Sequence, residues 1–153
     1  MKRTVAMILV IACTAALFAG CGGKKKDFEP QSFIDELLAG ANFKDSLNRL
    51  DDPVVPILYD IDEDDYSEAI VYCGTAATAE EIAVFTAADS AAAERLLAAA
   101  QKRVDKLIES YKSYGPAAAM TLENSVVTRS GDYVVVVVCS DNESAGKICE
   151  KYF

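Results

Sequence analysis

The spacing of hydrophobic and polar residues changes along the chain, and each spacing predicts a different element. The longest helical pattern begins at Asp89 or Ser90, either of which can cap it, and continues to about Ser113. Such a helix is about 36 Å long at 1.5 Å per residue, enough to cross a whole sheet. Its apolar stripe comprises Ala93, Leu97, Ala100, Val104, Leu107, Ile108 and Tyr111. Four of its basic residues fall off that stripe: Arg95, Lys102, Arg103 and Lys106.

Shorter helical patterns lie at the two ends of the same region. Residues 32–38 predict a helix that Ser32 caps and that ends near Gly40. Its buried stripe would be Phe33, Ile34, Leu37 and Leu38. Residues 142–153 predict a helix that closes the chain. Gly115 and Pro116 end the long helix that begins at Asp89 or Ser90, and residues 117–122 predict one further helical turn. The closing helix would bury Ala145, Ile148, Cys149 and Tyr152.

Four runs have the composition and alternation of strands. Residues 66–73 and 81–86 predict one antiparallel hairpin, and 126–129 with 133–139 predict a second around Ser130-Gly131-Asp132. The last run is apolar on both faces, which is typical of a central strand. The segment 43–50 fits a strand or a short helix equally well.

These elements predict the α+β class. We expect an antiparallel sheet of about four strands with the long helix packed across it, plus short N-terminal and C-terminal helices. Residues 31–153 would form this single domain. A mature chain of about 133 residues is too small for the two lobes of a solute-binding protein.

The first 21 residues have the layout of a secretory signal. Lys2 and Arg3 precede an apolar run, and small residues lead to Cys21. This ending resembles the lipobox of bacterial lipoproteins, although Phe18 is larger than the aliphatic residue usual there. The resemblance implies a signal peptide at 1–20, a lipidated tether at 21–30 and a diacylglycerol on Cys21. The apolar run is shorter than the roughly 20 residues of a membrane-spanning helix.

Charge divides the chain into two unlike parts. All 24 acidic residues and 10 of the 15 basic ones lie from Asp27 onward, which gives that part a net charge of −14. The tether carries Lys24, Lys25 and Lys26, each worth about 1 kcal/mol near acidic lipids. So acidic a domain is not expected to bind nucleic acid.

Three cysteines remain after Cys13 leaves with the signal and Cys21 takes the lipid. They are Cys73, Cys139 and Cys149. They are either three small buried apolar residues or include one Cys73–Cys139 bridge, since both lie near strand ends. Their spacing does not fit a zinc site.

No residue is assigned a catalytic, cofactor or metal role. Because the sequence lacks histidine, imidazole-based triads are excluded. The acidic run 60–65 resembles the opening of a calcium loop, but Asp65 replaces its glycine and Val71 its glutamate, so we expect a solvated loop. Glu80 and Glu81 would point to opposite faces of a strand and form a charged strand entrance.

Several short motifs occur in an order similar to that of domain-of-unknown-function family 4358, a group of small bacterial lipoproteins. They are Tyr59-Asp60-Ile61-Asp62, Ala79–Phe85, Tyr111, Tyr114-Gly115-Pro116 and Gly131-Asp132-Tyr133-Val134. The resemblance covers about residues 33–153. It implies a single-domain lipoprotein and brings no assigned activity.

The function expected from these features is binding. The chain would be a non-enzymatic module, anchored to membrane lipid through Cys21 on the extracytoplasmic face of the cell membrane and contacting a protein, peptide or envelope component. Tyr111, Tyr114 and Pro116 either form a recognition surface or cap the hydrophobic edge of the sheet. Alternatives are a small carboxylate-based hydrolase and a protease-inhibitor or chaperone-like regulatory domain.

Overall fold

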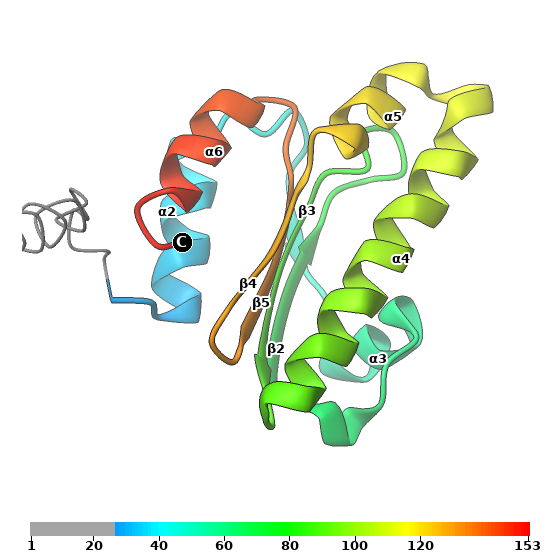
Figure 1. The fold of residues 1–153 in the computed structure, drawn as a ribbon. Coiled ribbons are helices and arrows are strands. Elements are labelled where there is room, and N and C mark those ends of the chain that lie inside the picture. The colour runs from blue at the N-terminus through cyan, green and yellow to red at the C-terminus, as the bar shows by residue number, and fades with distance from the viewer. Residues whose placement is uncertain (1–26) are drawn as a thin grey trace, which may run out of the picture.

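Five antiparallel strands form one sheet with helices on both faces (Figure 1). The computed structural model describes residues 27–153. The predicted signal peptide, Cys21 and most of the predicted tether therefore lie outside the described residues. The α+β class predicted from the sequence is confirmed, with one more strand than expected.

The sheet has the order β1-β2-β3-β5-β4. β5 lies between β3 and β4, so its prediction as a central strand is confirmed. The ambiguous segment 43–50 contains a two-residue edge strand that pairs with the end of β2. Both of its residues are exposed, so no alternation marked it in the sequence. The strands are β1 Asn48–Arg49, β2 Tyr66–Cys73, β3 Glu81–Ala87, β4 Val126–Ser130 and β5 Tyr133–Val138.

The helices form two layers. α2 and α6 cover one face of the sheet, while α3, α4 and α5 lie on the other side (Figure 1). Their bounds are α2 Pro30–Gly40, α3 Val55–Tyr59, α4 Ser90–Tyr114, α5 Pro116–Glu123 and α6 Asn142–Cys149. Two 3₁₀ turns, η2 Asp52–Val54 and η3 Glu63–Asp65, flank α3. Within residues 27–153, no helix combines the length and apolar character needed to cross a bilayer.

Alternation along the central strands builds a separate core on each face. In β3, Ala83 and Phe85 pack under α4, whereas Ile82 and Val84 pack under α2 and α6. The valines of β5 divide between the two cores in the same way. Because both faces are covered, β5 is apolar on both faces, as the sequence indicated, and β3 is apolar between Glu81 and Thr86.

α4 is capped as predicted, since the Asp89 carboxylate accepts a 2.7 Å hydrogen bond from the backbone N–H of Ala92. Its buried stripe is rotated from the predicted one, because Leu96 is buried and Leu97 is only partly so. Gly115 ends the helix where its backbone lies close to the Tyr111 ring, since a Cβ at this position would lie 2.8 Å from Tyr111 Cδ1.

Three details of the short helices differ from the prediction. α2 begins at Pro30, and the carboxylate of Glu29 caps it by accepting from Gln31 N and Ser32 N, so Ser32 is not the cap. Leu38 is exposed, because the buried side of α2 is narrower than predicted. α6 ends at Cys149, four residues early.

An aromatic cluster closes the α2–α6 layer where the chain enters the domain. The Phe28 ring lies 4.6 Å from Tyr133, 5.3 Å from Phe33 and 5.1 Å from Phe153, measured between centroids. Tyr152 packs against the same rings. This cluster fixes the first described residues to the sheet and to the last turn of the chain.

Candidate functional site

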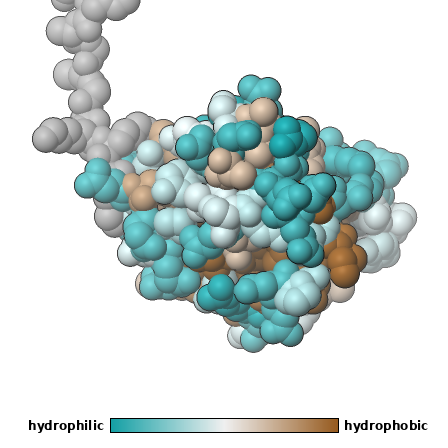
Figure 2. All heavy atoms as spheres, turned by 90° about the horizontal axis from the view of Figure 1, so that it is seen from below, coloured by the Kyte–Doolittle hydropathy of each residue, from teal (hydrophilic) through white to brown (hydrophobic). Residues whose placement is uncertain are grey.

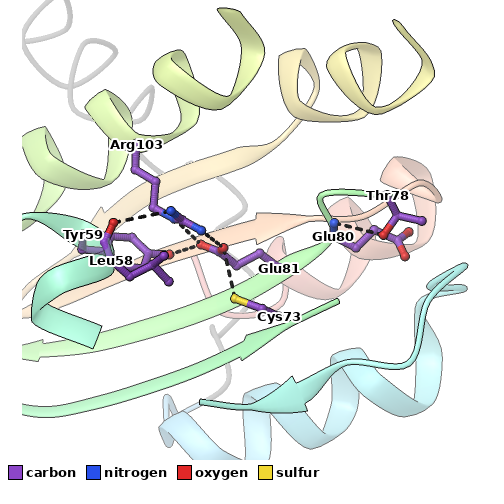
Figure 3. A network of polar contacts seen from close by, with 7 residues as sticks. All are labelled: Leu58, Tyr59, Cys73, Thr78, Glu80, Glu81 and Arg103. Atoms are coloured by element: carbon purple, nitrogen blue, oxygen red, sulfur yellow. Dashed lines mark hydrogen bonds and ion pairs between the residues drawn. The ribbon is translucent and has the colours of Figure 1, made fainter. Parts of the chain in front are cut away.

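The most concentrated buried polar chemistry lies at the start of β3. Glu80 and Glu81 are both buried, so the charged strand entrance predicted for them lies inside the fold. The physical reason is that each carboxylate has enough hydrogen-bond donors around it to replace water. The two side chains do point in different directions, as the strand geometry predicted (Figure 3).

Glu81 is held by donors from three elements. Its Oε1 accepts from the Tyr59 hydroxyl at the end of α3 and, at 3.0 Å, from Nε of Arg103 in α4. Its Oε2 accepts from Arg103 Nη2 at 2.5 Å and from the Cys73 thiol of β2 at 3.2 Å (Figure 3). Both carboxylate oxygens are therefore fully engaged.

Arg103 reaches this carboxylate from the side of α4. Its side chain is only 15% exposed, and its guanidinium also donates to the Leu58 carbonyl at 3.4 Å and lies 5.0 Å from the centre of the Tyr59 ring. Burial alone would lower the pKa of Arg103, but the hydrogen bonds and charge of Glu81 outweigh it and raise that pKa. The guanidinium is thus a permanent cation that compensates Glu81.

The other two members of the cluster are held in their neutral forms. Burial, followed by the charge of Glu81, raises the pKa of the Tyr59 hydroxyl well above its ordinary value. The same two causes raise the pKa of the Cys73 thiol. A protonated phenol and a protonated thiol can donate hydrogen bonds, but neither is activated as a nucleophile.

Sequence reasoning missed this cluster, although a signal for it was present. Arg103 was placed off the apolar stripe of the long helix, yet it follows Ala100 by three residues and precedes Leu107 by four. That spacing puts it on the border of the buried face. Tyr59 likewise follows the buried Val55 by four residues, which places both on the inner side of α3.

The Glu80 carboxylate joins two loops on the side of the sheet away from Arg103. Its Oε2 accepts from the backbone N–H of Asp45, and its Oε1 from that of Ser140, both at 2.9 Å. The Asp45 carboxylate in turn accepts from the N–H and hydroxyl of Thr75, at 2.6 and 2.5 Å, and from the Thr78 hydroxyl. Glu80 and Asp45 therefore fix the β2–β3 connection to two distant segments.

The described cysteines are all free, so the Cys73–Cys139 bridge is not formed. Cys73 lies at the end of β2 and packs with the α4-side core, whereas Cys139 follows β5 and packs with the α2–α6 core. β3 separates these strands, and two strand spacings of about 4.8 Å exceed the reach of a disulfide. Burial raises the pKa of Cys139 and of Cys149 to about 11.

Two small hollows flank Arg103. One, of about 110 Å³, lies between α3 and α4 and is lined by Tyr59 and Lys106. The other, of about 120 Å³, is lined by Cys73 and Tyr111. Arg103 and Leu107 line both. Each is well below the roughly 300 Å³ of an ordinary small-molecule site. The arrangement is suited to joining β2, β3, α3 and α4.

The residues predicted as a recognition surface differ in exposure. Tyr111 is buried and donates a 2.6 Å hydrogen bond from its hydroxyl to the Ala76 carbonyl. Tyr114 and Pro116 are exposed, and the Tyr114 ring lies 4.9 Å from that of Tyr111. Only Tyr114 and Pro116 thus offer surface to a partner.

The acidic run 60–65 is mostly solvated, as expected. Asp65 differs, because it is buried against Arg95 of α4, whose Nε and Nη2 both donate to its carboxylate. The hydrogen bonds from Arg95 lower the pKa of Asp65. Among the described residues, no three potential metal ligands gather into a site.

The fold and this cluster define a small α+β domain whose buried charges fasten helices and loops to the sheet. A protein-family comparison matches residues 41–139 to the family described as Domain of unknown function (DUF4358), and the chain belongs to that family. The resemblance predicted from the sequence motifs is thereby confirmed. No curated protein and no solved structure matches the chain.

Proposed function

We propose that this protein is a lipid-anchored module of the extracytoplasmic membrane face that binds a partner without catalysing a reaction. The observation that carries the proposal is the N-terminal pattern, in which a basic head, a 14-residue apolar run from Val5 to Phe18 and small residues lead directly to Cys21. Lipid on Cys21, together with the adjacent lysines, would hold the chain at an anionic bilayer.

The state of the buried carboxylates supports binding over catalysis. A carboxylate-based hydrolase needs two acids that face each other across the scissile bond, with one raised in pKa. Glu81 is instead compensated by Arg103 on one side of the sheet, and Glu80 accepts two backbone hydrogen bonds on the other. Both are occupied in maintaining the fold.

The distribution of charge supports an orientation for the domain. The basic residues 24–26 lie close to the proposed lipid, whereas the part from Asp27 onward carries −14. An anionic membrane surface attracts the first and repels the second. The domain would therefore stand away from the bilayer with its acidic surface available to other molecules.

The anchor is tested by mass spectrometry of the membrane-bound protein. We expect a mature N-terminus at Cys21 that carries lipid, and we expect Cys21→Ala either to appear in the soluble fraction or to keep its signal. Cys13→Ala is the matched control, because it removes a cysteine from the apolar run without touching the attachment residue. A Cys21→Ala protein that is processed and membrane-bound like the control would refute the proposal.

A further inference from the structure

The outer side of α3 carries an apolar surface that the fold does not use. Val55 and Tyr59 occupy the inner side of this short helix and are buried. Ile57 lies between them in sequence and is 82% exposed, and Val54 is 43% exposed. Pro53 adds to the same exposed surface. Isolated exposed apolar residues are ordinary, but three within five positions, two in η2 and one in α3, form a contact surface.

Acidic side chains surround this apolar surface. A shallow, open hollow there is lined by Pro53, Pro56, Ile57, Asp60, Ile61, Asp62, Glu63 and Asp64. Figure 2 views the molecule from the side toward which α3 lies in Figure 1, and it shows patches of hydrophobic side chains set among hydrophilic ones. We call the lining residues, together with Val54, the α3 surface.

Most of the negative charge on the α3 surface is not neutralised. Asp60 forms an ion pair with Lys102 at 2.8 Å. Asp62, Glu63 and Asp64 form no ion pair with any residue between 27 and 153. No lysine or arginine occurs in the sequence between Arg49 and Arg95, and Arg95, whose charge reaches Asp62, is hydrogen-bonded to Asp65. The surface therefore combines an exposed apolar centre with a negative rim.

We propose that the α3 surface binds a cationic segment of a partner protein, in which lysine or arginine residues flank an apolar side chain. The apolar side chain would cover Ile57 and Val54, and the flanking cations would lie against Asp62, Glu63 and Asp64. The inference rests on the proposed function, because it gives the binding module a place and a partner chemistry. Charge complementarity selects this partner over an anionic bilayer, nucleic acid or a second copy of the acidic domain.

The test uses the full chain in nanodiscs of a zwitterionic lipid, with empty nanodiscs as the reference. The probe is a fluorescent peptide with two leucines flanked on each side by three lysines, and binding is measured by anisotropy at low and high salt. Two comparison peptides replace the lysines with glutamates or the leucines with serines. We expect the first peptide to bind, the glutamate peptide not to bind, and the serine peptide to bind more weakly.

Two pairs of variants separate the contribution of the apolar centre from that of the rim. Ile57→Ser should weaken peptide binding by about tenfold, as expected for uncovering one large aliphatic side chain. Met120→Ser, at a 64% exposed residue of α5, should not weaken it. The double variant Glu63→Gln/Asp64→Asn should weaken binding at low salt, with a difference that shrinks as salt rises. Glu109→Gln/Glu123→Gln makes the same change of net charge on other helices and should have little effect.

Several results would overturn the proposal. Equal binding by the Ile57→Ser and Met120→Ser variants, or equal binding of the leucine and serine peptides, would reduce the interaction to non-specific attraction of a polycation. A change in self-association rather than peptide binding in Ile57→Ser would identify a second copy as the occupant. The anchor is scored separately by the mass of the mature N-terminus, so loss of peptide binding with a lipidated Cys21 rejects only the α3 surface.

Discussion

Arg103 and Glu81 are joined by two hydrogen bonds, Nε to Oε1 at 3.0 Å and Nη2 to Oε2 at 2.5 Å, in a pair that fastens α4 to the central sheet. The Glu81 side chain is 5% exposed and that of Arg103 15% exposed. A charge this well enclosed depends on its partner, because water cannot replace the missing contacts.

Arg103→Met is therefore expected to lower the free energy of unfolding by about 3–5 kcal/mol, since it leaves Glu81 buried without a counter-charge. The measurement is urea denaturation followed by circular dichroism. Lys102→Met is the control: its neighbouring ion pair with Asp60 is exposed, so its loss should change stability little. The double variant Glu81→Leu/Arg103→Met should recover part of the loss. Equal effects of the Arg103 and Lys102 substitutions would contradict this role for the pair.

Gly115→Ala should destabilise the end of α4. A Cβ at this position would lie 2.8 Å from Tyr111 Cδ1, so the ring must move and its hydrogen bond to the Ala76 carbonyl would be strained. Overpacking of this kind costs about 1–3 kcal/mol. Gly146→Ala is the matched control, because nothing lies within 4 Å of a Cβ there. That change within α6 should stabilise the protein by about 0.5–1 kcal/mol. Thermal unfolding measures both variants, and we expect a lower melting temperature for Gly115→Ala and a higher one for Gly146→Ala.

Alkaline pH should destabilise the domain through its buried thiols. Burial raises the pKa of Cys139 and of Cys149 from an ordinary 9.0 to about 11. The folded protein keeps these protons while the unfolded chain loses them, so this stability is complete below pH 9 and is lost as pH rises through 11. The slope of unfolding free energy against pH in this range should be shallower in Cys139→Ala than in the parent protein. Identical slopes would show that burial does not hold the thiol neutral.

Acid should loosen the β2–β3 connection through Asp45. Hydrogen bonds from Thr75, chiefly through its side chain, lower the pKa of the Asp45 carboxyl below its ordinary 3.8. The stabilisation is present above pH 3.8 and is lost as pH falls through the lower folded value. Asp45→Asn should reproduce the effect at neutral pH as faster hydrogen exchange of the Thr75 amide, which donates to that carboxylate. Asp105→Asn, on the exposed side of α4, should leave this exchange rate unchanged.

Elements that depend on local pattern were the ones predictable from sequence. β2 has the bounds expected from its alternation, and the uniform valines of β5 identified it as central. The cap at Asp89 and the stop at Gly115 depend on adjacent residues and were also recognised. The family resemblance rested on ordered motifs and is confirmed by the match to residues 41–139.

Features that depend on contacts between distant segments were not predictable in this way. β1 has two exposed residues, and only its pairing with the end of β2 makes it a strand. Glu81 is acceptable in the interior because Arg103, 22 positions later, reaches it from α4. Periodicity treats a charged residue as an outer one, so it placed Arg103 off the buried stripe and gave no sign that Glu81 is enclosed. The Tyr111 hydroxyl likewise finds its acceptor at Ala76, 35 positions earlier.

The aromatic cluster around Phe28 has a mechanical consequence. Any pull applied to the chain ahead of the domain reaches Phe28 first, before it reaches α2. Phe28 contacts Phe33 in α2, Tyr133 in β5 and Phe153 after α6, so the load is divided among a helix, a strand and the last residue of the chain. Lys151 and Tyr152 add bonds from the last residues of the chain to Glu36 of α2. The domain would therefore resist being unravelled turn by turn from its leading end.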